Sequence, residues 1–206
     1  MTLPAAGKVD LLPLHSRTPA SWAHSVLEDP IALLIDHAFL EKKAANNAMD
    51  LLTRWPDEWM NGWVETMTMV ARDEAAHLAQ VVRLLLRRGG RLGRAHQNPY
   101  ATGLRLLVRG GGTKDTLDRL MVSALIEARS CERFAVLAAA CQDTELAAFY
   151  RALFTSELGH YKVFLKLANR IAPQDEVEPR WQQMLAAEAD ILARQLPGPR
   201  IHSGVV

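Results

Sequence analysis

Apolar residues recur along most of this chain at alternating spacings of three and four residues, the repeat that lines one face of an α-helix. Four such stripes follow one another, at residues 34–52, 63–84, 120–141 and 146–171. Each stripe is long enough to form a core helix. The pattern predicts an all-α protein built around a four-helix bundle.

Residues that cap or break helices set the expected bounds of these elements. The four bundle helices are expected from Asp29-Pro30 to about Arg54, from Pro56-Asp57 to Gly89-Gly90, from Thr113 to about Cys141, and from Asp143 to about Ala172. A fifth, C-terminal helix is expected from about Asp175 to Gln195, followed by a tail at residues 197–206. Residues 1–18 lack the basic-then-apolar pattern of a targeting peptide, so they are expected to form an extended N-terminal arm that wraps the bundle.

Six polar side chains fall at core positions of the four stripes: Glu41, Glu74, His77, Glu127, Glu157 and His160. Four of them form two Glu-x-x-His pairs, and both members of a pair share one helix face because residues i and i+3 are neighbours on a helix. Each buried carboxylate would cost several kcal/mol without compensation. Two divalent cations would neutralise the four carboxylates, so the six residues are predicted to bind two metal ions.

The order Glu, Glu-x-x-His, Glu, Glu-x-x-His is that of ferritin-like bundles that hold two iron or manganese ions. Oxygen-rich ligation with two imidazoles and no thiolate favours these metals over zinc or copper, and two iron ions are expected here. By the geometry that such bundles share, one ion would be bound by Glu41 and His77, the other by Glu127 and His160, and both by the bridging Glu74 and Glu157.

Other carboxylates near the stripes have different expected roles. Ligand imidazoles usually donate their second N–H to a carboxylate or carbonyl, and Asp73 and Asp36 are candidates to accept it. Glu132 is excluded as a ligand because it lies about 140° around the helix from Glu127. It is expected to be solvated or to support a ligand.

Length and composition agree with one domain spanning residues 1–206, of which 49% are hydrophobic, with a net charge of +1. No uncharged apolar run approaches the roughly 18 residues that a membrane span needs, so a cytoplasmic protein without membrane contact is expected. Cys131 and Cys141 fall on an apolar stripe and are expected to pack in the core. Because the chain has no Cys-x-x-Cys pair for a second iron centre, electrons are expected from an external electron-transfer protein or reductant.

Charge is distributed unevenly, because residues 83–119 hold nine Lys or Arg against two Asp. Arginines at the end of a helix complement its dipole, which would explain Arg87 and Arg88 alone. The connection at residues 89–112 is basic and rich in glycine, so it is expected to follow a polyanion, with flexible backbone between arginines that contact phosphates. Nucleic acid is the favoured ligand, and an anionic membrane surface or an acidic protein are the alternatives. The residues expected to bind RNA are Arg87, Arg88, Arg91, Arg94, Arg105, Arg109 and Lys114.

These residues resemble those of a known family, the ferritin-like di-iron tRNA hydroxylases of the MiaE type. The resemblance covers most of the chain, and its most specific segments are Asp36-His-Ala-Phe-Leu-Glu41, Ala71-Arg-Asp-Glu74-Ala-Ala-His77, Ile126-Glu127-Ala-Arg-Ser-Cys-Glu-Arg-Phe134 and Ser156-Glu157-Leu-Gly-His160. It implies iron at the six positions, O2 and a reductant, and hydroxylation of the isopentenyl side chain of 2-methylthio-N6-isopentenyladenosine in tRNA. Met67, Phe134, Ala138 and Phe164, within a few turns of the ligands, are candidates to line a pocket for that side chain.

Three other functions remain open from the sequence. A ubiquinone-precursor hydroxylase shares the ligand pattern but works at a membrane, and the basic segment has no accompanying apolar face. A peroxidase or ferroxidase of the rubrerythrin type would more often carry its own thiolate iron centre. An RNA-binding bundle with purely structural metals is the alternative without catalysis, and the oxygen reactivity of the reduced protein would separate it from the enzymes. The oligomeric state is left open.

Overall fold

A computed structural model describes residues 12–55 and 61–205 of the chain. Residues 1–11 of the predicted arm and the predicted helix start at Pro56-Asp57 lie outside the described residues. Within the described ranges the regular structure is entirely helical, as predicted. The helices are α2 (Ala20–Val26), α3 (Pro30–Leu52), α4 (Trp63–Arg87), α5 (Pro99–Arg105), α6 (Gly112–Ala140), α7 (Thr144–Ile171) and α8 (Gln174–Ala193).

Local sequence explains where the bundle helices begin. The Asp29 side chain accepts a hydrogen bond from the Ala32 N–H at 2.9 Å, and Pro30 occupies the first turn of α3. The Asp143 side chain caps α7 in the same way, accepting from the amides of residues 145 and 146. Gly111 and Gly112 precede and begin α6 with left-handed φ values of 90° and 54°, a conformation that glycine adopts without a steric penalty.

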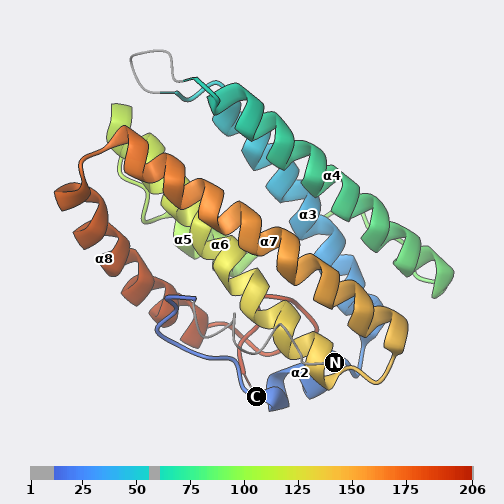
Figure 1. The fold of residues 1–206 in the computed structure, drawn as a ribbon. Coiled ribbons are helices and arrows are strands. Elements are labelled where there is room, and N and C mark those ends of the chain that lie inside the picture. Colours follow the sequence, from blue (N-terminus) through green and yellow to red (C-terminus); the bar gives the residue numbers. More distant parts are fainter. Residues whose placement is uncertain (1–11, 56–60, 206) are drawn as a thin grey trace, which may run out of the picture.

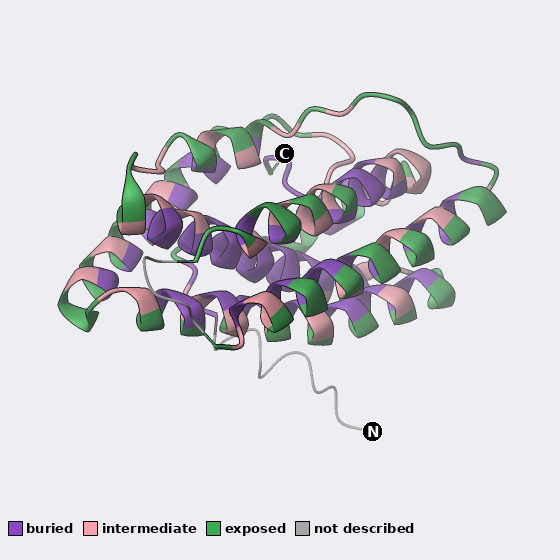
Figure 2. Cartoon of the chain, turned by 90° about the horizontal axis from the view of Figure 1, so that it is seen from above, coloured by how far each residue is buried: buried purple, intermediate pink, exposed green. Residues whose placement is uncertain are grey.

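Two antiparallel hairpins, α3–α4 and α6–α7, lie side by side and form the four-helix bundle (Figure 1). Helix α8 packs along the outside of this bundle, against α5, α6 and α7. Buried residues form stripes on the faces of the helices that point to the bundle interior (Figure 2). The predicted bundle with a fifth C-terminal helix is therefore confirmed.

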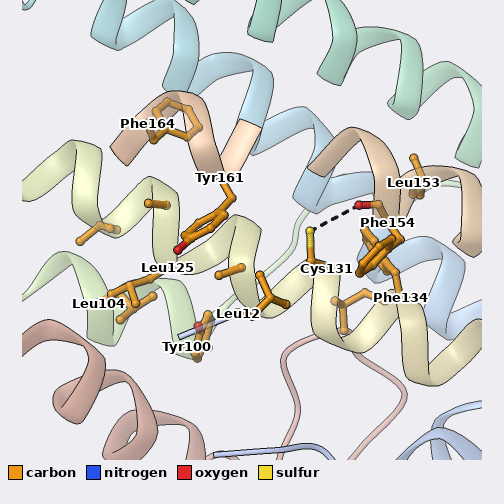
Figure 3. Close-up of a cluster of buried hydrophobic side chains, with 14 of the residues drawn as sticks. Leu12, Tyr100, Leu104, Leu125, Cys131, Phe134, Leu153, Phe154, Tyr161 and Phe164 are labelled. Carbon is orange, nitrogen blue, oxygen red and sulfur yellow. Dashed lines mark hydrogen bonds between the residues drawn. The ribbon is translucent and has the colours of Figure 1, made fainter. Parts of the chain in front are cut away.

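The hydrophobic core continues along the α6–α7 interface and reaches α5 and the N-terminal arm (Figure 3). Cys131 is fully buried there, with its Sγ 3.6 Å from the carbonyl oxygen of Phe154. Leu12 and Leu14 of the arm are also buried, so this part of the arm packs on the bundle. Cys141 is only half-buried at the end of α6, so the expectation that both cysteines lie in the core holds for Cys131 alone.

The expectation of a flexible connection at residues 89–112 is wrong for part of it. Helix α5 lies inside this connection, capped by the Asn98 side chain, which accepts from the Ala101 N–H at 3.1 Å. Tyr100 and Leu104 of α5 are fully buried in the core. The connection therefore has its own anchored helix, and residues 91–95 before it are exposed.

The C-terminal segment is also not a free tail, because Ile201, His202 and Ser203 are buried. The Ser203 hydroxyl accepts a hydrogen bond from the Trp22 indole at 3.0 Å, which ties this segment to α2. The Ile201 N–H donates to Asp36 Oδ2 at 2.8 Å, which ties it to α3.

A network of buried charges joins α6 to α8 and to the arm. The Arg129 guanidinium donates to both Glu188 carboxylate oxygens, at 2.8 and 3.0 Å, and to Glu132 Oε2 at 3.1 Å. Glu132 also accepts from the Thr18 hydroxyl at 2.7 Å. The expectation that Glu132 is solvated or supports a ligand is therefore wrong. Its side chain is buried, and its hydrogen-bond partners are Thr18 and Arg129.

None of the helices in the described part of the chain is long and apolar enough to cross a membrane.

Candidate metal centre

Six side chains from four helices meet in the middle of the bundle. They are Glu41 of α3, Glu74 and His77 of α4, Glu127 of α6, and Glu157 and His160 of α7. All six are buried, with exposures of 7% or less. Their ligating atoms form two groups, in each of which the atoms lie within 4.8 Å of one another: Glu41, Glu74, His77 and Glu157 in one, and Glu74, Glu127, Glu157 and His160 in the other.

Glu74 and Glu157 belong to both groups because each faces both imidazoles. His77 Nδ1 lies 3.0 Å from Glu157 Oε1 and 3.6 Å from Glu74 Oε2. His160 Nδ1 lies 2.7 Å from Glu74 Oε1 and 3.1 Å from Glu157 Oε2. Both carboxylates are thus placed to bridge two ions.

The arrangement of these donor atoms suits a bound metal ion better than it suits hydrogen bonds among the side chains. Glu74 Oε1, Glu157 Oε1 and His77 Nδ1 are buried and have no hydrogen-bond partner among the described residues, although they lie close together. Buried polar atoms normally find a partner, and several that converge without one are typical of a site for an ion. Carboxylates and imidazoles at this ratio suit iron or manganese.

Electrostatics also favours a bound cation. Burial raises the pKa of Glu74 to about 8, and repulsion from Glu157 adds to the rise. Burial likewise raises the pKa values of Glu41 and Glu127. For Glu157, contact with the two imidazoles outweighs the effect of burial and lowers the pKa. The surroundings of three of the four carboxylates therefore disfavour their ionised form unless a cation compensates the negative charge.

One further residue at the centre was missed from the sequence. His37 is fully buried, and its Nε2 lies 2.6 Å from Glu41 Oε1, so the imidazole orients this carboxylate. Its ring stacks on Tyr150 with a centroid distance of 5.6 Å. His37 precedes Glu41 by one helical turn, and this i, i+4 spacing is the signal that could have identified it.

The two aspartates proposed to support the imidazoles lie in different places. Asp73 Oδ2 lies 3.6 Å from His160 Nε2, on the side of the ring away from the carboxylates. Among the described residues, Asp36 forms no hydrogen bond or ion pair with His77 or His160. Its Oδ1 instead lies 2.7 Å from His96 Nε2, in the connection before α5, because Asp36 points to the outer side of α3.

A cavity of about 630 Å³ opens beside the metal centre, between α3, α6 and the segment that contains α5. Glu127 lines it, so the cavity reaches one of the candidate ligands. Apolar side chains form part of its wall, among them Leu40, Ala44, Val122 and Ile126. The four residues expected to line a pocket, Met67, Phe134, Ala138 and Phe164, do not line this cavity and pack in the core instead.

Polar groups line the rest of this cavity. The Asn47 amide donates to the Ser123 hydroxyl at 2.9 Å and so joins α3 to α6 across its wall. Three cationic residues also line it: Lys43, Arg105 and Arg119. The cavity therefore offers an apolar surface, hydrogen-bonding groups and positive charge beside Glu127, a candidate metal ligand.

The seven residues expected to bind RNA do not form one surface. Arg87 and Arg88 pair with Glu145, and Arg88 also lies 2.6 Å from Asp143. Arg109 pairs with Asp118 at 2.9 Å. The other four, Arg91, Arg94, Arg105 and Lys114, are exposed, and Arg105 is the one that lines the cavity.

The chain was compared with known families, sequences and structures. Residues 8–203 match the family described as tRNA-(MS[2]IO[6]A)-hydroxylase (MiaE). The chain belongs to the MiaE family. The resemblance seen in its sequence motifs therefore extends over residues 8–203, nearly the whole of this chain.

Two relatives of this MiaE-family chain carry the name tRNA 2-(methylsulfanyl)-N(6)-isopentenyladenosine(37) hydroxylase. The protein from Pseudomonas putida KT2440 is 39% identical over 188 residues, which cover 91% of this chain and 90% of the relative. The protein from Salmonella typhimurium LT2 is 33% identical over 170 residues, which cover 82% of this chain and 61% of the relative.

A solved structure has the same fold. It is described as Protein 43 with aldehyde deformylating oxygenase activity from Synechococcus, and it superposes with a TM-score of 0.87 at 34% sequence identity. The match covers 94% of this chain and 96% of that chain. The MiaE-family chain thus shares its ferritin-like bundle with an oxygenase.

Proposed function

We propose that this MiaE-family enzyme hydroxylates the isopentenyl side chain of 2-methylthio-N6-isopentenyladenosine in tRNA. The observation that carries the proposal is the cavity, which is lined by apolar residues, by cationic residues and by Glu127 of the candidate metal centre. A prenylated nucleotide has both characters, since its side chain is apolar and its backbone is anionic. The names of the two relatives support the same substrate.

The metal centre is proposed to hold two iron ions. Glu41 and His77 would bind one ion, Glu127 and His160 the other, and Glu74 and Glu157 both. When bound, the ions would supply the means to activate O2, so that one oxygen atom enters a C–H bond and the other leaves as water with two electrons and two protons from an external donor.

The residues of the chain would position the substrate and protect the reaction. The wall formed by Ala44, Val122 and Ile126 would bind the prenyl chain and exclude water from the side of Glu127. His37 would keep the Glu41 carboxylate in place through its Nε2. Positioning of this kind would place the substrate C–H bond beside the candidate metal centre and would keep water away from it.

Deformylation of an aldehyde is the activity in the description of the similar solved structure. The cavity of this chain carries Lys43, Arg105 and Arg119 beside its apolar wall. An aldehyde group is uncharged and cannot form an ion pair with these cations, whereas a nucleotide carries an anionic phosphate. We therefore favour the nucleic-acid substrate, and an aldehyde is included in the test.

The test combines metal content with analysis of the product. We expect about two iron ions per chain, and a gain of one oxygen atom on the modified nucleoside after incubation with prenylated tRNA, O2 and a reductant. Glu74→Ala should lose metal and product, whereas Glu65→Ala, at an exposed position of the same helix, should retain both. Two irons with no tRNA product, or with conversion of an aldehyde instead, would overturn the proposed substrate.

A further inference from the structure

In the described part of the chain, two of the three cations that line the cavity have no carboxylate paired with them. Lys43 and Arg105 both line the cavity, and neither forms an ion pair within residues 12–55 and 61–205. Arg119, the third cation of the cavity, donates to Asp115 at 2.7 Å. Positive charge therefore remains available at Lys43 and Arg105.

The Lys43 ammonium is held in place by uncharged acceptors. Its Nζ lies 2.9 Å from His96 Nδ1 and 3.5 Å from the His96 carbonyl oxygen. An ammonium only donates, so His96 Nδ1 must accept, and the ring proton must lie on Nε2. These contacts orient Lys43 without cancelling its charge.

Two further contacts fix His96 itself. Its Nε2 donates to Asp36 Oδ1 at 2.7 Å, which holds the ring in the tautomer that leaves Nδ1 free to accept from Lys43. The ring also stacks on Phe39, with centroids 4.9 Å apart and planes 3° from parallel. Because the second oxygen of Asp36 accepts from the Ile201 N–H, the carboxylate is anchored in turn.

We propose that Lys43 and Arg105 bind a phosphodiester group of the RNA strand whose modified nucleoside enters the cavity, and that Asp36 and His96 position Lys43 for this contact. The inference rests on the proposed function. A guanidinium and an ammonium beside one cavity suit phosphate oxygens, since arginine presents a fork of N–H donors and lysine a compact charge. The phosphate would hold the nucleotide while its apolar substituent lies against the wall near Glu127.

Binding of a labelled anticodon stem-loop RNA with the modified adenosine tests this site. The metal-loaded full-length protein is titrated by fluorescence anisotropy at several salt concentrations. Lys43→Gln and Arg105→Gln should each raise Kd about tenfold and reduce the slope of log Kd against log salt by about one. The matched control is Lys42→Gln, which makes the same charge change at an exposed neighbour outside the cavity and should leave Kd within about twofold.

The positioning role of His96 predicts coupling to Lys43. His96→Ala should raise Kd severalfold, and the Lys43→Gln/His96→Ala double variant should bind no more weakly than Lys43→Gln alone. His96→Gln, which retains a carbonyl acceptor, should recover part of the loss. Additive effects in the double variant, or no recovery with Gln, would overturn the positioning role.

The outcomes separate this site from the proposed function. Hydroxylation of tRNA by the wild-type protein, with equal Kd and salt slope for the Lys43 and Lys42 variants, would overturn the phosphate site and leave the function standing. No hydroxylation, with selective weakening by Lys43→Gln and Arg105→Gln, would support the site and overturn the function. The Lys43→Gln and Arg105→Gln variants could instead bind inorganic phosphate more weakly but bind the stem-loop RNA as the wild-type protein does. That result would show that the two cations bind a free anion, and it would overturn the proposed RNA contact.

Discussion

His37 shows how one side chain could support the candidate metal centre without itself being one of the six candidate ligands. It donates to Glu41 from within the core, between aromatic rings of α6 and α7. Groups that orient a ligand carboxylate usually affect metal affinity by 10- to 100-fold. The position therefore lends itself to a direct test.

We expect His37→Leu to lower iron affinity by roughly 10- to 100-fold while still allowing two ions to bind at saturation. The Glu41 carboxylate would lose its donor and sample more than one orientation. Competition with a chelator measures the affinity, and His24→Leu, at an exposed histidine of α2, is the control. Equal affinities of the two variants would show that Glu41 needs no such support.

The six candidate ligands could be predicted because each sits in phase with an apolar helical stripe, and the structure brings all six together. The cavity could not be predicted in the same way. It depends on α5 and the preceding residues folding back over α3 and α6, a long-range contact that leaves no periodic signal in the sequence. Lys43 and His96 meet for the same reason, although they are far apart in the chain.

At the scale of elements, the bundle helices follow their sequence patterns closely, whereas the short segments around them do not. Helix α5 spans seven residues, too few for a helical repeat to stand out. Its stability comes from Tyr100 and Leu104 in the core and from the bond between Tyr100 and Glu188 at 2.9 Å. Such tertiary contacts are invisible in a local pattern.

The buried Glu188 predicts a large stability effect. Glu188→Gln should lower the free energy of unfolding by about 3 kcal/mol or more, because Arg129 would keep its buried charge without its main counterion. Urea unfolding measures the change. Glu178→Gln, at an exposed position of the same helix, should change it by less than about 0.5 kcal/mol. A similar small effect at both positions would contradict the importance of this network.

Close packing of the C-terminal segment predicts a second stability effect. A Cβ added at Gly204 would lie 1.9 Å from the carbonyl oxygen of Gln195, a backbone atom that cannot move aside easily. Gly204→Ala should therefore destabilise the protein by about 1–3 kcal/mol. Gly93→Ala, where nothing lies within 4 Å of the added atom, should be close to neutral. Thermal unfolding of the two variants compares them, and equal midpoints would mean that the segment is loosely held.

For the whole molecule, the buried C-terminal segment introduces a dependence on pH. Burial lowers the pKa of His202 well below its usual value near 6.5, and the nearby Arg133 and Arg129 add to this effect. The unfolded chain therefore takes up a proton below about pH 6.5 that the folded protein excludes. Stability is lost as the pH falls from there toward the folded-state pKa.

His202→Gln should reduce this loss. Removing one such group lowers the slope of unfolding free energy with pH by up to about 1.4 kcal/mol per pH unit below pH 6.5. Unfolding in urea at pH 7.5, 6.0 and 5.0 measures the slope, and His15→Gln, at an exposed histidine, is the control. If the unfolding free energies of the wild-type protein and His202→Gln changed equally with pH, that result would contradict a neutral, buried His202.

Each hairpin of the bundle contributes one carboxylate to the candidate ion site that the other hairpin otherwise forms. Glu157 of α7 completes the group around His77, and Glu74 of α4 completes the group around His160. A bound ion would therefore act as a cross-link between the two halves of the chain, at a place where α4 and α7 otherwise touch little. Amide hydrogen exchange should slow in both hairpins together on iron loading, because neither half could open without releasing an ion that the other half also holds.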